Sequence, residues 1–141
     1  MVILDNYLSQ IENFILTSTE KFKSENKQPT SIGIYCCPWA GWLTTNFNIS
    51  TTLEETENNC PDFEFVEFGL LELDKWQEEY EKDVPTFKIS ETVINHNHDL
   101  GDENINEIVF KFLEPIAITI KLKFQTEILL QILDSNCIKV L

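Results

Sequence analysis

Two histidines and an aspartate, His96, His98 and Asp99, are the only concentration of side chains here that commonly bind transition metals. In an extended segment, residues two apart face the same way, so both imidazoles could reach one ion, with Asp99 as a third ligand. The surrounding residues 90–102 are polar and lack the rigid outer shell that such a site needs. We therefore expect a solvated loop, and a metal-dependent enzyme using these three residues is the alternative hypothesis.

The remaining residues show no catalytic signature. No serine lies in a G-x-S-x-G turn, and no glycine-rich phosphate loop occurs among only 4 glycines. The cysteines, at positions 36, 37, 60 and 137, lack C-x-x-C spacing and are expected to be free structural thiols. Cys36 and Cys37 should point to opposite faces of a strand, which predicts that one is buried and the other is not. The sequence favours a non-enzymatic protein without a cofactor.

Negative charge is concentrated in one stretch. The net charge is −14, there is no arginine, and residues 54–83 carry twelve carboxylates against two lysines. The lack of a basic footprint argues against nucleic-acid binding, whereas an acidic surface attracts basic proteins or simply keeps the chain soluble. The first residues lack the basic and long apolar regions of a signal peptide, and no apolar run reaches roughly 18 residues. We expect a cytoplasmic protein that does not bind membranes.

Two aromatic residues stand inside this acidic stretch. Trp76 and Tyr80 lie four residues apart, and so on one face of a short predicted helix, 74–82. They could pack that helix against the rest of the protein, or they could anchor a partner within an acidic rim. For the second case, the predicted contact residues are Glu54, Glu55, Glu57, Trp76, Glu78, Glu79 and Tyr80.

The scaffold for these residues is predicted to centre on residues 31–48. There, β-branched and aromatic residues flank Pro38 and Gly41, which indicates two strands joined by a turn. A hairpin is not stable alone in water, so other elements must cover it. Apolar residues at helical spacing predict an amphipathic helix over 4–24 to do so.

The middle of the chain alternates short elements. Residues 50–59 predict a short acidic helix, and residues 62–74 predict a strand. The alternation of that strand changes phase near Val66, which indicates a bulge or a strand covered on both faces. A short extended piece is expected at 84–88, followed by a long loop over 90–102.

The last third is predicted to be mainly helical. Glu103 begins a long helix that meets Pro115, and residues 116–124 fit either a strand or the continuation of a kinked helix. We favour the helix, because no turn residues separate Glu114 from the apolar run that follows. A final helical segment at 129–133 and a short closing strand at 137–141 complete the chain.

The layout resembles that of small bacterial immunity proteins, which neutralise toxins. The matching parts are the N-terminal amphipathic helix, the aromatic strand pair ending at Asn48, the Trp76 and Tyr80 segment, and the C-terminal helix with its last strand. The run after Pro115 departs from that layout. The resemblance implies a non-enzymatic inhibitor that occludes a basic toxin domain.

These observations predict a single α/β domain of the α+β type over residues 1–141. Its sheet should be mostly antiparallel and packed against the N- and C-terminal helices. The expected function is an acidic cytoplasmic binding protein of the immunity type, with a basic toxin domain as partner. Besides the metal-dependent enzyme, a self-associating structural subunit is a further alternative, and it would form a homo-oligomer through exposed aromatic residues.

Overall fold

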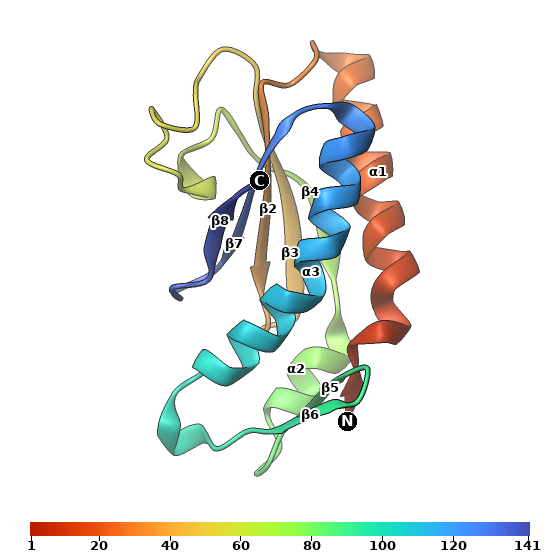
Figure 1. Cartoon of the computed structure of the whole chain (residues 1–141), viewed down its shortest axis with the longest axis vertical. Coiled ribbons are helices and arrows are strands. Elements are labelled where there is room, and N and C mark those ends of the chain that lie inside the picture. Colours follow the sequence, from red (N-terminus) through yellow and green to blue (C-terminus); the bar gives the residue numbers. More distant parts are fainter.

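The computed structural model describes residues 1–141 and has the predicted hairpin at its centre (Figure 1). Strands β2 (Ser31–Cys37) and β3 (Trp42–Asn48) pair antiparallel, with Ser31 opposite Asn48 and Cys37 opposite Trp42. Gly41 has a φ of 68° in the connecting turn, a conformation that glycine adopts without steric cost. The predicted strand–turn–strand is therefore confirmed.

Three more strands extend the hairpin to a sheet of order β4-β3-β2-β7-β8. Strand β4 (Phe65–Glu72) is antiparallel to β3, β7 (Glu127–Ile132) is parallel to β2, and β8 (Ile138–Val140) is antiparallel to β7. The helical segment predicted over 129–133 is wrong. This short apolar run does not distinguish helix from strand by itself, and it becomes a strand because it lies beside β2.

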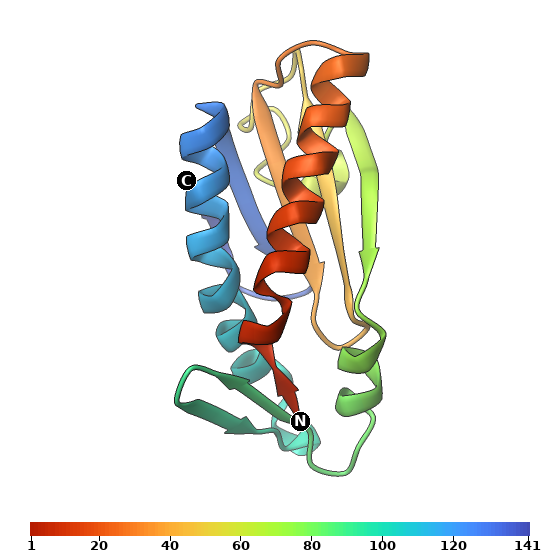
Figure 2. The same ribbon diagram turned by 90° about the vertical axis from the view of Figure 1, so that its right-hand side faces the viewer.

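Two long helices cover one face of this sheet (Figures 1 and 2). They are α1 (Leu8–Glu25), which follows a 3-10 turn over Leu4–Tyr7, and α3 (Glu103–Phe124). The second helix passes through Pro115, so the favoured helical interpretation of 116–124 is confirmed. A core of 25 buried residues fills the space between helices and sheet, with Phe22 stacked on Phe47 at 4.2 Å between ring centroids.

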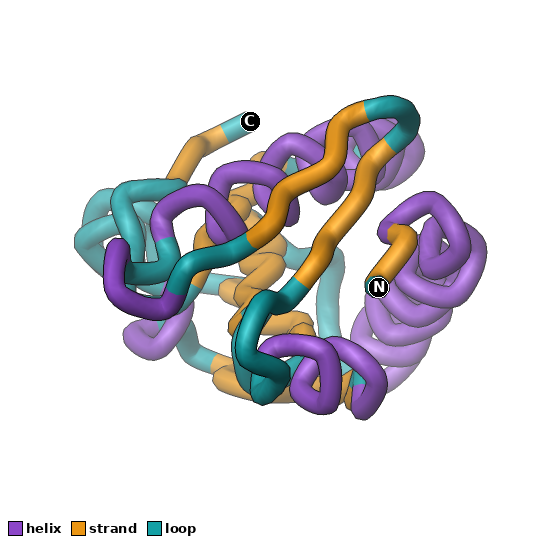
Figure 3. Tube along the Cα trace, turned by 90° about the horizontal axis from the view of Figure 1, so that it is seen from below, coloured by secondary structure: helices purple, strands orange, loops and turns teal.

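A second, three-stranded sheet closes one end of the molecule (Figure 3). It consists of β1 (Val2–Ile3), β5 (Thr86–Ile89) and β6 (Thr92–Asn95), in the order β1-β5-β6. The short helix α2 (Asp74–Tyr80) lies at the same end (Figure 1). The loop predicted over 90–102 is wrong in its first half. Residues 92–95 form strand β6, because β5 provides an antiparallel partner.

The change of phase in β4 is a β-bulge, as predicted. Phe65 pairs with Phe47 and Gly69 pairs with Thr45, so three residues of β4 lie opposite the single residue Asn46. Glu67 at the centre of the bulge has a φ of 53°, and its N–H donates to the Asn46 side chain at 2.7 Å. Because the bulge adds two residues, Phe65 and Gly69 lie on the same face of β4, and within the bulge the Phe68 ring also packs on Phe22 and Phe47.

The helix predicted over 50–59 is wrong, because residues 49–64 form turns and a single 3-10 turn at Cys60–Asp62. The Glu64 carboxylate accepts the backbone N–H groups of Ile49, Ser50 and Thr51, at 3.0, 2.8 and 2.6 Å, and so holds the start of the segment. Glu57 and Asn58 have positive φ values of 55° and 51°, which interrupt a right-handed helix. Apolar side chains of the segment pack on the sheet face opposite the helices in a cluster of Leu53, Cys60, Phe63 and Leu129.

The fold is thus α+β, with mostly antiparallel sheets and with the N- and C-terminal helices on the larger one. None of its helices combines the length and the apolar character needed to cross a membrane.

Candidate functional site

The structure divides the predicted contact residues between two ends of the molecule. Glu54, Glu55 and Glu57 are exposed on the 49–64 segment, whereas Glu78 is exposed on α2 at the other end of the sheet (Figure 1). Trp76 is completely buried, and Glu79 is 5% exposed. A partner that approaches the folded protein cannot reach these last two side chains, so the predicted residues do not form one surface.

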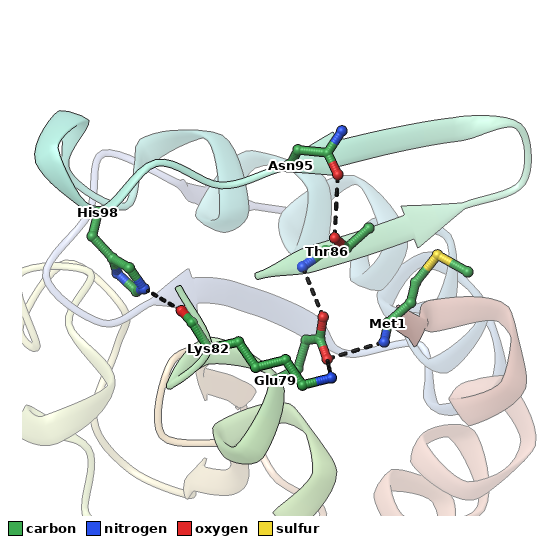
Figure 4. Close-up of polar contacts among 6 residues, drawn as sticks. All are labelled: Met1, Glu79, Lys82, Thr86, Asn95 and His98. Carbon is green, nitrogen blue, oxygen red and sulfur yellow. Dashed lines mark hydrogen bonds and ion pairs between the residues drawn. The ribbon is translucent and has the colours of Figure 1, made fainter. Parts of the chain in front are cut away.

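Glu79 joins three segments at the closed end of the molecule (Figure 4). Its carboxylate accepts from the Met1 ammonium at 3.0 Å and from the Thr86 N–H at 2.9 Å, and it pairs with Lys82. Burial alone would raise the pKa of this carboxyl, but the hydrogen bonds and positive charges lower the pKa to about 2. Glu79 therefore holds α2 against β1 and β5.

Trp76 and Tyr80 attach α2 to its surroundings. The Trp76 ring packs edge to face on Tyr7, with centroids 5.5 Å apart, and on Phe87 at 6.4 Å. The half-buried Tyr80 donates its hydroxyl proton to Asp102 at 2.8 Å. Burial and then this hydrogen bond to a carboxylate raise the pKa of Tyr80 to about 12. In the structure, Trp76 and Tyr80 therefore pack α2 against the rest of the protein, which is the first of the two roles predicted for them.

The two histidines have different surroundings and do not point to a common ion. His96 is 1% exposed, and its Nδ1 lies 2.9 Å from the Asn104 side-chain oxygen. Its Nε2 lies 3.2 Å from Asp102 Oδ1, but at an angle that makes no hydrogen bond. His98 is exposed and contacts the Lys82 carbonyl oxygen at 2.9 Å (Figure 4).

No three His, Cys, Asp or Glu side chains of the chain come together as a metal-binding group, so the arrangement offers the metal-dependent hypothesis no ligand set. The expectation of a fully solvated loop is wrong for His96, whose ring lies against Tyr80 with centroids 5.8 Å apart. That contact is made across 16 residues of sequence, so polarity alone could not have predicted it.

The cysteines are free, and the adjacent pair is buried on both sides of β2. The prediction that one of Cys36 and Cys37 is exposed is therefore wrong. Burial raises the pKa of the Cys37 thiol to about 11, although amide N–H groups of Ala40 and Trp39 counteract this. Burial also raises the pKa of Cys36 and Cys60. Such thiols are poor nucleophiles at neutral pH.

The sheet face opposite the helices is only half covered. The 49–64 segment lies over the part near the start of β2 (Figure 1), whereas Trp42 and Leu70 near the β2–β3 turn keep accessible side chains. On the part near this turn, which we call the open half-face, lie the half-buried ring of Trp42 and the side chain of Leu70, which is 48% exposed. The half-buried ring of Tyr35 lies at its border and also packs against the cluster of the 49–64 segment. The two rings meet edge to face with centroids 5.6 Å apart.

A hollow of about 360 Å³ adjoins the open half-face, and we call it the acidic hollow. Three of its lining residues are carboxylates, Glu67, Glu72 and Asp74, and none is basic. The full lining is Ala40, Gly41, Trp42, Glu67, Leu70, Glu72, Asp74 and Gln77. An aromatic surface beside unpaired carboxylates is suited to a basic side chain, which combines charge attraction with contact to the Trp42 ring.

Sequence reasoning counted these carboxylates but did not assign them to a site. Their common position depends on the pairing of Trp42 with Glu72 across β3 and β4 and on the bulge at Glu67. The sequence pattern that could have located the aromatic part of the site is the alternation within the hairpin. It predicts that Tyr35 lies on the opposite face of the sheet from its neighbours in sequence. No family model, curated protein or solved structure matches this chain.

Proposed function

We propose that this chain is a cytoplasmic, non-enzymatic binding protein of the immunity type, which neutralises a basic toxin domain by covering it. The observation that carries the proposal is the Tyr35–Trp42 pair beside the acidic hollow. Neutralisation by occlusion needs no chemistry from the inhibitor, only a surface that binds tightly and selectively.

The two parts of the surface have complementary roles. The aromatic rings offer large, rigid contact area of the kind that dominates interface energies. Glu67, Glu72 and Asp74 attract a basic partner, raise the rate of encounter and disfavour acidic competitors. A Lys or Arg side chain of the partner would lie over Trp42, with its charged end next to Glu72.

The same charges disfavour self-association through this surface. Two copies that meet face to face bring Glu67, Glu72 and Asp74 of each close to those of the other, which costs free energy. The homo-oligomer alternative thus receives no support from the open half-face, and light scattering at several protein concentrations tests it directly.

The proposal is tested with two charge-matched double variants. The tagged chain captures its partner from its own host's lysate, supplemented with the product of the adjacent reading frame, at low salt and at severalfold higher salt. The captured protein is then purified, and its association rate is measured with wild type, Glu67→Lys/Glu72→Lys and Glu54→Lys/Glu57→Lys. We expect the first variant to slow association about tenfold and the second to change it far less.

The control pair carries the same change in net charge on the 49–64 segment, at positions that the sequence predicted as contacts. Equal slowing by both variants would mean that only total charge matters and would remove the assigned site. Unchanged association with both variants, or the absence of any basic partner at either salt concentration, would contradict the proposed function.

A further inference from the structure

Strand β4 is an edge of the five-stranded sheet and has a free side (Figure 2). Leu73, which directly follows β4, donates its backbone N–H to the Gly41 carbonyl at 2.6 Å. Hydrogen-bonded and non-bonded pairs alternate along an antiparallel ladder, so Leu71 and Gly69 also bond toward β3. The backbone N–H and C=O groups of Leu70 and Glu72 therefore point away from β3, where the sheet ends.

Two hollows of different chemistry lie on either side of this free edge. On the open half-face lies the acidic hollow. On the helix side, between α1 and β4, lies a hollow of about 430 Å³ that we call the α1–β4 groove. Its lining is Gln10, Asn13, Phe14, Thr17, Ser18, Lys21, Phe68, Gly69 and Leu70. Leu70 belongs to both linings.

Gly69 lets strand β4 lie close against α1 beside this groove. A Cβ at this position would lie 2.7 Å from Ser18 Oγ, 2.8 Å from Thr45 Oγ1 and 3.1 Å from the Phe14 ring. With hydrogen in place of a side chain, the backbone of β4 lies directly against α1. The rings of Phe14 and Phe68 line the groove. The edge therefore offers backbone hydrogen-bonding groups with a pocket on each side.

We propose that β4 binds an extended segment of the partner as an added strand, in which basic residues alternate with apolar ones. Successive side chains of a strand point to opposite faces of the sheet. Residues opposite Leu70 and Glu72 would enter the acidic hollow, and residues opposite Gly69 and Leu71 would enter the α1–β4 groove. This inference rests on the proposed function and specifies how the partner is held.

Charge identifies the occupant as a basic segment and not as a second copy of the chain. Pairing two β4 strands would bring Glu67 and Glu72 of both copies together, and acidic side chains on an edge commonly prevent such self-pairing. The bulge at 66–68 also restricts the regular part of the edge to residues 69–72. The expected segment is therefore short, about five residues long.

The test uses a labelled peptide, acetyl-Lys-Val-Lys-Val-Lys-amide, and fluorescence anisotropy up to about 1 mM peptide. One control is Lys-Lys-Lys-Val-Val, which has the same composition and charge without alternation. Two further peptides carry N-methyl groups, either on the valine amides or on the lysine amides. Only one of these sets can face β4 in an added strand, so methylation of that set removes the hydrogen bonds and methylation of the other does not.

We expect the alternating peptide to bind at least tenfold more tightly than the block control, and one methylated peptide to lose at least tenfold while the other stays within twofold. Leu70→Pro, which removes an outward N–H, should weaken binding similarly, with circular dichroism reporting the fold. Equal binding of alternating and block peptides, equal effects of both methylations, or no binding would each overturn strand addition. If Glu67→Lys/Glu72→Lys still slows the association of the protein partner, the proposed function stands even when strand addition is overturned.

Discussion

The rings of Tyr35 and Trp42 lie edge to face, 5.6 Å apart, on neighbouring strands of the sheet, at the border of the area that the 49–64 segment covers. The pair is diagonal across the β2–β3 ladder, since Tyr35 is opposite Thr44 and Trp42 is opposite Cys37. Two aromatic rings held by paired strands lose little conformational freedom on binding. They are therefore suitable anchors for a partner.

Replacing Trp42 by alanine should weaken partner binding at least tenfold, because an anchor of this type commonly contributes about 2 kcal/mol or more. The ring is half-buried, so we expect a loss of unfolding free energy of about 1 to 2 kcal/mol as well. Leu122→Ala, on the exposed side of α3, is the matched truncation and should leave affinity unchanged. An affinity that is equal in both variants would show that Trp42 is not an anchor.

Replacing Glu79 by glutamine should lower the unfolding free energy at pH 7 by roughly 2 kcal/mol, because the buried carboxylate has three cationic or N–H partners. The pKa of Glu79 is about 2 in the folded state, below its ordinary value of 4.5. The folded state therefore binds fewer protons, and the contribution is complete above pH 4.5 and lost as the pH falls toward 2.

Urea unfolding at a series of pH values checks this prediction. The difference between wild type and Glu79→Gln should be constant from neutral pH down to about 4.5 and should shrink below that. The exposed neighbour Glu78 is the control, since Glu78→Gln has no comparable network to remove. A difference that does not change with pH would contradict the assigned ionisation.

Replacing Asp102 by asparagine should lower the pKa of Tyr80 from about 12 toward its ordinary value of 10.0, because the nearby negative charge is removed. Burial remains the larger cause of the shift, so the value should stay above 10.0. The absorbance of tyrosinate during alkaline titration reports this change, and Tyr80→Phe identifies the transition by deleting it. Asp99→Asn, in the same region, should leave the transition in place.

A thiol reagent should modify Cys137 before the other cysteines, because Cys137 is half-buried and the remaining three are fully buried. Burial raises the pKa of the Cys137 thiol as well as those of Cys36 and Cys60, so accessibility decides which thiol reacts first. In the native protein we expect about one of the four thiols to react quickly, and all four to react in denaturant. Rapid native reaction that persists in Cys137→Ser would show that another thiol is accessible.

Local periodicity was sufficient for the larger elements. The helix at the N-terminus, the hairpin around Pro38 and Gly41, the bulge in β4 and the closing strand follow from spacing and turn residues over short distances. The helical course of 116–124 could also be inferred. No turn residues follow Glu114, and Pro115 removes only one backbone hydrogen bond from a long helix. These features depend on neighbours in sequence, so the sequence by itself determined them.

Elements whose state depends on distant partners could not be predicted in this way. The apolar run at 127–132 is a strand because it pairs with β2, and residues 92–95 are a strand because they pair with β5. The turns at 49–64 are held at their start by Glu64, whose carboxylate binds backbone N–H groups from outside the local window. In each case a long-range contact outweighs a weak local preference.

The candidate site shows the same division. The sequence alone determined that the chain is strongly acidic, that its carboxylates concentrate in residues 54–83 and that aromatic residues accompany them. Only the tertiary structure decided which of these residues are accessible, because burial of Trp76 and Glu79 depends on contacts with the small sheet at the end of the molecule. Strand order and the β4 register bring Trp42 beside Glu67 and Glu72, and no local pattern contains that information.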